Sequence, residues 1–416
     1  MHEDLMEQVV DEENLERALR AVQRKRGAAG IDKMTSEELE PHFRRHGAEI
    51  GAKLVAGRWK PNPVRRVEIP KPNGGRRQLG IPTVMDRLVQ QALLQVLQPL
   101  FEPRFSESSW GFRPGRSAHD AVRAAQGYVR EGKDWVVDID IAQFFDAVHH
   151  DILMRRVAEV IHDKRVLRLI GRYLRAGVLA EGVVVRRAEG TPQGGPLSPL
   201  LANIYLDALD RELENRGLRF CRYADDCNIY VSSEAAAKRV LTGITAWIEK
   251  HLRLKVNEAK SGAGRPWERK FLGFRLNRQG QVEAAPESVE RFKQKVREIW
   301  RSDRAVTSRQ LRDEWLRYVR GWWGYYRLAE QRRTILVLEG WVRRHIRKCF
   351  WLRWHDARGR RRALRRLGIR ERLLKLVPAR RGAWRMAANG LVQTALSNAT
   401  LRRYGFAMPS DLAASY

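Results

Sequence analysis

Tyr223-Ala224-Asp225-Asp226 is the stretch that decides how this chain of 416 residues folds and works. Residues 218–222 and 227–231, on either side of it, are rich in aromatic and β-branched residues, which predicts a hairpin with two adjacent acids at its turn. Neighbouring side chains on a strand point to opposite faces, whereas both acids can reach one point at a bend. Two carboxylates held together repel each other unless a cation lies between them. The stretch therefore indicates either a divalent-metal site or a solvated turn, in which Asp is common.

A second acidic segment offers a third carboxylate. Residues 134–141 have the pattern of a strand interrupted by acids, and the strand period of two places Asp138 and Asp140 on the same face. A pair of Mg²⁺ ions roughly 4 Å apart, as used in in-line phosphoryl transfer, is held mainly by carboxylate oxygens. Spacing alone does not choose between Asp138 and Asp140.

Basic charge is concentrated in the last third of the chain. The net charge is +30, and residues 291–416 contain 32 Lys and Arg against 9 Asp and Glu, together with eight of the 13 Trp. Basic side chains interleaved with aromatic rings are typical of nucleic-acid binding, because cations neutralise phosphates and rings stack on bases. A membrane surface is the weaker alternative, since no lipidation signal or amphipathic anchor is evident. Each Trp taken singly is better explained by helix packing than by stacking.

Composition and cysteine usage restrict the class of protein. With 43% hydrophobic and 31% charged residues the chain has the balance of a soluble globular protein. No apolar run approaches the ~20 residues that span a bilayer, and the acidic N-terminus lacks a signal-peptide pattern. The three cysteines (Cys221, Cys227 and Cys349) argue against a disulfide framework and against a four-cysteine zinc module. We therefore expect a cytoplasmic protein.

Several motifs occur together in a recognisable order. They are Asp140-Ile141-x-x-Phe144-Phe145-Asp146, Pro192-Gln193-Gly194-x-x-x-Ser198-Pro199-Leu200, Tyr223-Ala224-Asp225-Asp226 and Phe271-Leu272-Gly273-Phe274. With Gly111-Phe112-Arg113-Pro114-Gly115-Arg116-Ser117 and the stretch 320–327, the chain resembles bacterial group II intron-encoded reverse transcriptase/maturases over essentially its whole length. This many motifs in order make a simple solvated turn at Asp225 and Asp226 improbable.

The resemblance implies an α+β fold of the right-hand polymerase type. Fingers and a palm with an antiparallel sheet would be followed by an α-helical thumb, called domain X, and a small basic C-terminal domain. The expected boundaries are an N-terminal extension at 1–50, fingers and palm at 51–285, the thumb at 286–367 and a DNA-binding region at 368–416.

The resemblance also implies roles for individual residues. It selects Asp140 over Asp138, so that two Mg²⁺ ions, replaceable by Mn²⁺, would be held by Asp140, Asp225, Asp226 and the backbone of Ile141. The incoming dNTP would contact Lys71, Arg77, Phe145 and Gln193, with Phe145 as the steric gate that excludes a ribose 2′-hydroxyl. The primer and template would contact Tyr223, Phe271, Leu272, Gly273 and Lys260, although Lys260 is almost as well explained as a solvated side chain. The RNA would contact Arg358, Arg360, Arg361, Arg362, Arg365 and Arg366.

The chain departs from the family pattern in two places. The family usually continues to an Asp-His pair where this chain has His149-His150, at a position peripheral to the metals. Members with a DNA endonuclease end in a Cys-rich module, whereas no cysteine follows Cys349 here. We therefore expect no nicking activity of its own and a primer supplied from elsewhere.

The function implied is that of an RNA-directed DNA polymerase that binds its host group II intron RNA, assists splicing and copies the RNA into cDNA during retrohoming. Its expected partners are the intron RNA, an RNA template with a DNA primer, target DNA and dNTPs, in the bacterial cytoplasm and without a membrane. Two alternatives are a splicing-only RNA-binding maturase, and a host-domesticated relative in defence or DNA repair. The intact set of Asp140, Asp225 and Asp226 weighs against the first alternative.

Overall fold

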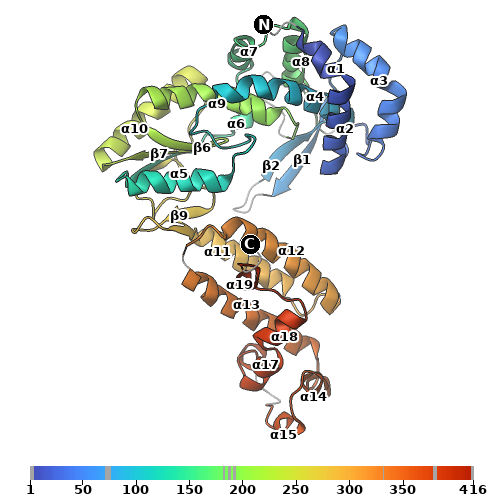
Figure 1. Ribbon diagram of the computed structural model, residues 1–416, viewed down its shortest axis with the longest axis vertical. Helices are drawn as coiled ribbons and strands as arrows, with labels where there is room; N and C mark the ends of the chain where they lie inside the picture. Colours follow the sequence, from blue (N-terminus) through green and yellow to red (C-terminus); the bar gives the residue numbers. More distant parts are fainter. Residues whose placement is uncertain are drawn as a thin grey trace. The chain divides into compact units, whose positions relative to one another are not determined.

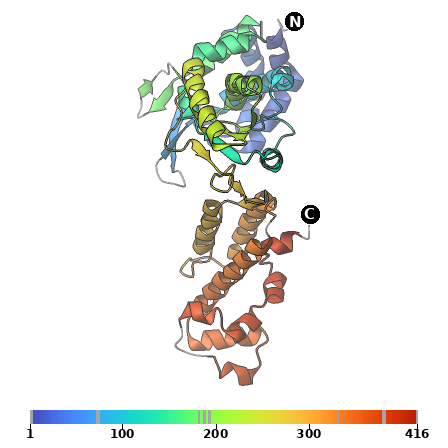
Figure 2. The ribbon, with the colours of Figure 1, turned by 90° about the vertical axis from the view of Figure 1, so that its left-hand side faces the viewer.

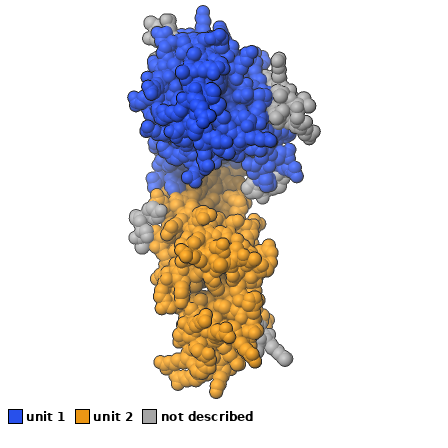
Figure 3. All heavy atoms as spheres, turned by 90° about the vertical axis from the view of Figure 1, so that its right-hand side faces the viewer, with its two compact units in different colours: residues 1–265 blue, residues 266–416 orange. Residues whose placement is uncertain are grey.

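The computed structural model describes residues 4–70, 76–180, 183–185, 189–190, 194–330, 332–377 and 382–413. The chain divides into two compact units, residues 1–265 and residues 266–416 (Figures 1 and 3). Each unit has a hydrophobic core of its own. No helix in these described ranges is both long and apolar enough to cross a membrane.

The first unit is built from helices around two sheets. Its helices are α1 (Leu5–Val10), α2 (Glu12–Lys25), α3 (Leu39–Val55), α4 (Val84–Phe101), α5 (Ala118–Arg130), α6 (Phe144–Ala147), α7 (His150–Ala158), α8 (Lys164–Arg175), α9 (Ser198–Asn215) and α10 (Glu234–Trp247), with a 3₁₀ turn η1 (Glu102–Arg104) and a π-helical turn η2 (Ile248–Leu252). Local signals begin several of them. The Thr83 side chain accepts from the Asp86 amide at the start of α4, and Ser117 and Asp120 form a capping box on α5.

The sheet that positions the candidate site is fully antiparallel, with strand order β6-β7-β3-β8. Its strands are β3 (Trp135–Ile139), β6 (Arg219–Tyr223), β7 (Asp226–Val231) and β8 (Gly262–Gly264). Helix α10 packs against β3 and β8, and α9 packs against β6. Figure 1 shows α9 and α10 near β6 and β7. Buried side chains such as Val137, Phe220 and Ile229 join this sheet to the main core of the unit.

The second sheet has strand order β2-β1-β4-β5. Strand β1 (Val64–Pro70) pairs antiparallel with β2 (Arg76–Ile81) and parallel with β4 (Val178–Ala180), and β4 pairs antiparallel with β5 (Val183–Val185). Parallel neighbours need a long crossover, which here includes α4 to α8 and strand β3.

The second unit is mainly helical. After a hairpin of β9 (Phe274–Leu276) and β10 (Val282–Ala284) it contains α11 (Pro286–Ile299), α12 (Ser308–Tyr326), α13 (Arg332–Arg353), α14 (Ala357–Arg366), α15 (Glu371–Leu374), α16 (Ala383–Met386), α17 (Gly390–Ala395), α18 (Asn398–Arg403) and α19 (Pro409–Ala413) (Figure 2). Phe292, Trp315 and Ile346 form one core with Phe406 and Met408 from the end of the chain. A smaller cluster joins α13 and α14 to the segment after them.

The expected α+β fold, with an antiparallel sheet followed by a helical region, is confirmed. The tryptophans of the last third are mostly used in packing: Trp300, Trp315, Trp323 and Trp351 are buried. Within residues 291–330, 332–377 and 382–413, no tryptophan is fully exposed.

Candidate active site

The two adjacent acids lie at the predicted hairpin turn. Tyr223 of β6 pairs with Asp226 of β7, so Ala224 and Asp225 form the turn itself. Ala224 has a φ of +57°, in the left-handed region that costs an L residue about 1–2 kcal/mol. The two-residue turn therefore carries backbone strain at Ala224, directly before Asp225 and Asp226.

Strand register places Asp140 beside this turn. In the β3–β7 pair Asp138 is opposite Asn228 and Ile139 is opposite Cys227, so continuing the register by one residue sets Asp140 opposite Asp226. Directly opposed residues in an antiparallel pair share a face, and so do Tyr223 and Asp226. Asp140 and Asp226 therefore flank one point at the end of the sheet, with Asp225 next in the turn.

Backbone contacts hold Asp140 and Ile141 in place. The Asp140 amide donates to Ser261 Oγ at 2.9 Å, and its carbonyl accepts from the Asn257 amide at 2.8 Å. Ile141 forms an antiparallel bridge with Val256 and is buried. The Lys260 ammonium lies 3.5 Å from Asp140 Oδ2, and 63% of the Lys260 side chain is exposed.

The described residues contain no group of three or more His, Cys, Asp or Glu side chains closed around a point as in a metal site. The backbone brings the three acids to one end of the sheet without gathering their oxygens around a common centre. The Lys260 ammonium is the cation beside Asp140. The donor chemistry nevertheless fits magnesium, since carboxylate oxygens are its preferred protein ligands.

A buried arginine, which sequence reasoning missed, supports the turn. Arg222 is fully buried; its Nε and Nη2 donate to Asp210 of α9 at 2.6 and 2.5 Å. Its Nη1 donates to the Ala224 carbonyl at 2.9 Å and to Asn203 Oδ1 at 3.0 Å, and Nη2 also donates to Ser109 Oγ at 2.7 Å. Burial by itself would lower the pKa of Arg222, but the Asp210 carboxylate outweighs this effect. The pKa is therefore raised above its ordinary value, and the side chain stays charged. The sequence did hold one sign of this role: Arg222 is a charged residue that shares a strand face with the apolar Phe220.

The segment before α5 lies along the edge of β6. Ser109 bridges Arg222 in parallel, and the Trp110 amide donates to the Arg222 carbonyl at 2.8 Å. Gly111 then touches the turn: a Cβ on it would lie 2.3 Å from the Ala224 nitrogen. Only glycine allows this approach without a shift of backbone.

The expected dNTP residues are only partly described. Phe145 lies in α6, 8% exposed, with its ring centroid 5.1 Å from that of Phe144. Lys71 and Gln193 lie outside the described residues, as does the side chain of Arg77, whose backbone pairs with Ile69 across β1 and β2.

The expected primer-contacting stretch is a tight turn in the second unit. Leu272 and Gly273 have φ values of +52° and +80°, and a Cβ on Gly273 would lie 2.8 Å from the Tyr326 hydroxyl. Tyr325 donates to the Leu272 carbonyl at 2.8 Å. The stretches Phe271–Phe274 and 320–327, both singled out in the sequence, thus pack against each other.

The six arginines expected to bind RNA lie on α14, but they are not equivalent. Arg358, Arg361, Arg362 and Arg366 are exposed. Arg360 lies 4.7 Å over the Trp351 ring and donates to the Trp351 carbonyl, and Arg365 forms a bidentate pair with Glu371 at 2.7 and 2.8 Å.

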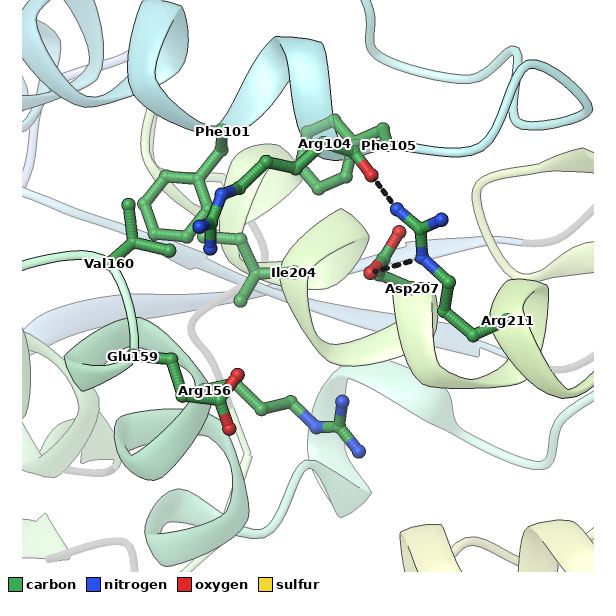
Figure 4. A pocket seen from close by; sticks show the side chains of 9 residues that line it. All are labelled: Phe101, Arg104, Phe105, Arg156, Glu159, Val160, Ile204, Asp207 and Arg211. Carbon is green, nitrogen blue, oxygen red and sulfur yellow. Dashed lines mark hydrogen bonds and ion pairs between the residues drawn. The ribbon is translucent and has the colours of Figure 1, made fainter.

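A separate cavity of about 300 Å³ lies beside α9, between the end of α4 and the end of α7 (Figure 4). Arg104, Arg156 and Arg211 line it together with Glu159 and Asp207, over an apolar floor that includes Phe101 and Ile204. Burial, followed by the nearby Asp210, raises the pKa of Asp207. None of the described residues expected at the catalytic site lines this cavity.

Comparison with known proteins gives two family matches. Residues 69–276 match reverse transcriptase (RNA-dependent DNA polymerase), and residues 289–368 match the group II intron, maturase-specific domain. Protein YkfC of Escherichia coli (strain K12) is 32% identical over 297 residues, which cover 62% of this chain and 78% of that protein.

Two further relatives are matched over shorter stretches. Group II intron-encoded protein LtrA of Lactococcus lactis subsp. cremoris is 42% identical over 172 residues, 41% of this chain and 28% of that protein. An uncharacterized 91 kDa protein in a cob intron of Schizosaccharomyces pombe is 44% identical over 153 residues, 37% of this chain and 19% of that protein. The matched part is thus less than a third of the length of either relative.

Proposed function

The chain belongs to the reverse transcriptase family, in its group II intron-encoded branch, and from this premise we propose that it polymerises DNA on an RNA template at the Asp225–Asp226 turn. The observation that carries the proposal is the β3–β7 register, which, continued by one residue beyond Ile139, sets Asp140 opposite Asp226 and next to Asp225. Three carboxylates, one just after β3, one in the turn and one at the start of β7, are a donor set suited to divalent ions in nucleotidyl transfer.

In this proposal Asp140, Asp225 and Asp226 hold two Mg²⁺ ions, with the Ile141 carbonyl as a further oxygen ligand. The bound ions would supply Lewis-acid stabilisation of the attacking and leaving oxygens. The chain's own residues do the positioning. Arg222 and Gly111 fix the turn, while Ser261 and Asn257 fix the backbone of Asp140.

Lys260 has a defined part in this proposal. Its ammonium, 3.5 Å from Asp140 Oδ2, offsets the repulsion among the acids before substrate binds. An exposed pair of this kind is worth little, about 0–1 kcal/mol, so it can break when the incoming triphosphate or the metals arrive.

The second unit supplies the RNA-binding function in this proposal. The maturase-specific domain match covers α11 to α14, and α14 exposes Arg358, Arg361, Arg362 and Arg366. We assign group II intron RNA to this unit as its partner in splicing. RNA template, DNA primer, target DNA and dNTPs are the ligands proposed for the polymerase reaction.

Primer extension on an RNA template tests the proposal. We expect Asp225→Asn and Asp140→Asn to abolish Mg²⁺-dependent cDNA synthesis while binding of the primer–template duplex is retained. Asp138→Asn is the matched control, since it lies on the same strand and is not assigned to the metals. Undiminished synthesis by Asp225→Asn would refute the assignment.

The splicing role needs a separate measurement. We expect Asp225→Asn to support splicing of the cognate intron RNA at the wild-type rate, because the intron RNA is assigned to the second unit. A loss of RNA affinity in the same variant would contradict this division of labour.

A further inference from the structure

Phe112 carries an exposed aromatic ring beside the catalytic turn. The residue is 45% exposed, and its ring centroid lies 6.5 Å from that of Tyr223, with the two planes tilted by 45°. Tyr223 precedes Asp225 by two residues and pairs with Asp226, so its side chain lies on the face of the sheet that bears Asp226. The two rings therefore adjoin the expected reaction centre.

The backbone holds Phe112 in an uncommon conformation. Its φ is +61°, a value that bulky L residues rarely adopt. The preceding Gly111 is pressed against the turn, where a Cβ would lie 2.3 Å from the Ala224 nitrogen. Asn203 Nδ2 of α9 donates to the Gly111 carbonyl at 2.9 Å. The neighbouring contacts thus impose the strained φ that presents the ring.

Two arginines fix the rest of this loop. Arg113 donates to the carbonyls of Ser106 and Ser109 at 2.5 and 2.9 Å, and its guanidinium is buried. Arg116 lies 5.1 Å over the Trp110 ring. The loop is therefore anchored on both sides of Phe112, and its exposed aromatic ring can meet a ligand.

We propose that Phe112 and Tyr223 form an aromatic platform for a nucleobase at the reacting end of the primer–template duplex. This inference rests on the proposed polymerase function. Every base has a π-face, so such a contact tolerates any sequence, as template copying demands. Residues with strained backbone cluster at functional sites, and Phe112 is one such residue. An apolar ring that is exposed beside the proposed catalytic acids is also typical of a binding surface. We choose the primer–template duplex as the ligand because the platform adjoins the turn. The end of the duplex must lie at Asp225 for the reaction to occur.

Binding and fluorescence of a labelled duplex test the platform. The probe is an RNA template with a DNA primer that carries 2-aminopurine either at the primer 3′ end or at the facing template position. We expect Phe112→Ala to raise the Kd about 5- to 150-fold, the loss of one base–ring stack. It should also change the 2-aminopurine emission of the bound complex at one of the two positions, whereas Phe112→Tyr should keep the wild-type values.

Control variants separate the platform from folding and from the polymerase assignment. Val55→Ala removes another exposed apolar side chain of the same unit, from α3, and should leave the Kd unchanged. Phe112→Gly removes the ring and relieves the backbone, so it should bind as weakly as Phe112→Ala, with a thermal midpoint no lower than that of Phe112→Ala. A wild-type Kd and emission in Phe112→Ala, or a Tyr variant as weak as the Ala variant, would overturn the platform. Failure of the polymerase function would be seen differently, as primer extension that survives in Asp225→Asn.

Discussion

Arg222 and Asp210 form a fully buried ion pair beside the turn that carries Asp225, joined through two donors at 2.6 and 2.5 Å. Asp210 belongs to α9 and Arg222 to β6, so the pair ties the helix to the strand that leads into the turn. The same guanidinium reaches the Ala224 carbonyl inside the turn. A charge-assisted network thus positions the backbone that carries Asp225.

Breaking this pair should cost both stability and activity. We expect Arg222→Met and Asp210→Leu each to lower the free energy of unfolding by about 3–5 kcal/mol, because the remaining partner stays buried without its counter-charge. Urea denaturation gives this value, and primer extension should show a lower kcat. Arg216→Gln at the end of α9, which breaks the more exposed pair with Glu212, should cost less than about 1 kcal/mol.

The double variant Arg222→Met with Asp210→Leu separates positioning from stability. Apolar replacements of similar size often restore stability to a buried pair. We expect it to regain part of the unfolding free energy but not the kcat, because the Ala224 carbonyl no longer has its donor. Recovery of kcat together with stability would show that Arg222 acts only through the fold.

We expect replacement of Gly111 to reduce activity, whereas replacement of Gly127 in the following helix α5 should not. Gly111→Ala places a methyl group 2.3 Å from the Ala224 nitrogen, so the turn must move and kcat for primer extension should fall at least tenfold. Gly127→Ala in α5 meets nothing within 4 Å and should stabilise the chain by about 0.5–1 kcal/mol. Equal activity in the two variants would contradict the role of the close approach.

The hairpin turn was accessible from sequence because it depends on local patterns. Hairpin arms, a turn and an acidic strand are each encoded within ten residues, whereas the choice of Asp140 over Asp138 came from the family resemblance and stays a prediction. The contacts of Arg222 that hold the turn in place could not be predicted from local patterns. Arg222 meets Asp210 and Ser109 from sequence distances of 12 and 113 residues, so its partners are decided by tertiary packing.

The basic C-terminal region shows the same limit. Composition indicated a polyanion-binding surface, yet it could not tell which arginines are already engaged. Arg360 packs on Trp351 and Arg365 pairs with Glu371, interactions that arise only when α14 packs on its neighbours. Charge counts in a sequence therefore overestimate the number of cations free to meet phosphates.

Phe145 should behave both as a core residue and as the proposed gate. Because it is 8% exposed, Phe145→Ala should cost about 3–5 kcal/mol of stability, as should Phe144→Ala, whose ring is 2% exposed. Only Phe145→Ala should raise ribonucleotide incorporation relative to deoxynucleotides, measured at a temperature where both variants are folded. Equal discrimination by the two variants would remove Phe145 from the dNTP site.

His345 should make stability depend on pH. Burial, followed by the charges of Lys348, Arg297 and Arg344, lowers its pKa from the ordinary 6.5 to about 4. Between these values the unfolded chain binds more protons, so the His345 contribution to stability falls as pH drops from about 6.5 toward 4.

The effect can be isolated by comparing two histidines. Because His345 is only half-buried, solvent screening reduces the effect to ~1–2 kcal/mol. Urea denaturation at pH 7 and pH 5 should show a smaller pH effect in His345→Gln than in the wild type. The matched control for the loss of an imidazole is His251→Gln, which removes an exposed histidine stacked on Trp247. Identical behaviour of the two variants would contradict the assigned pKa.

The exposed arginines of α14 should dominate the salt dependence of RNA binding. Changing Arg358, Arg361, Arg362 and Arg366 to Gln should flatten the slope of log K against log salt by about 0.7–0.9 for each phosphate that is no longer neutralised. Arg365→Gln should change the slope less, because its charge is already compensated by Glu371. Filter binding of the intron RNA across a salt series gives both slopes. An unchanged slope in the fourfold variant would mean that α14 is merely solvated and that the RNA lies on another surface.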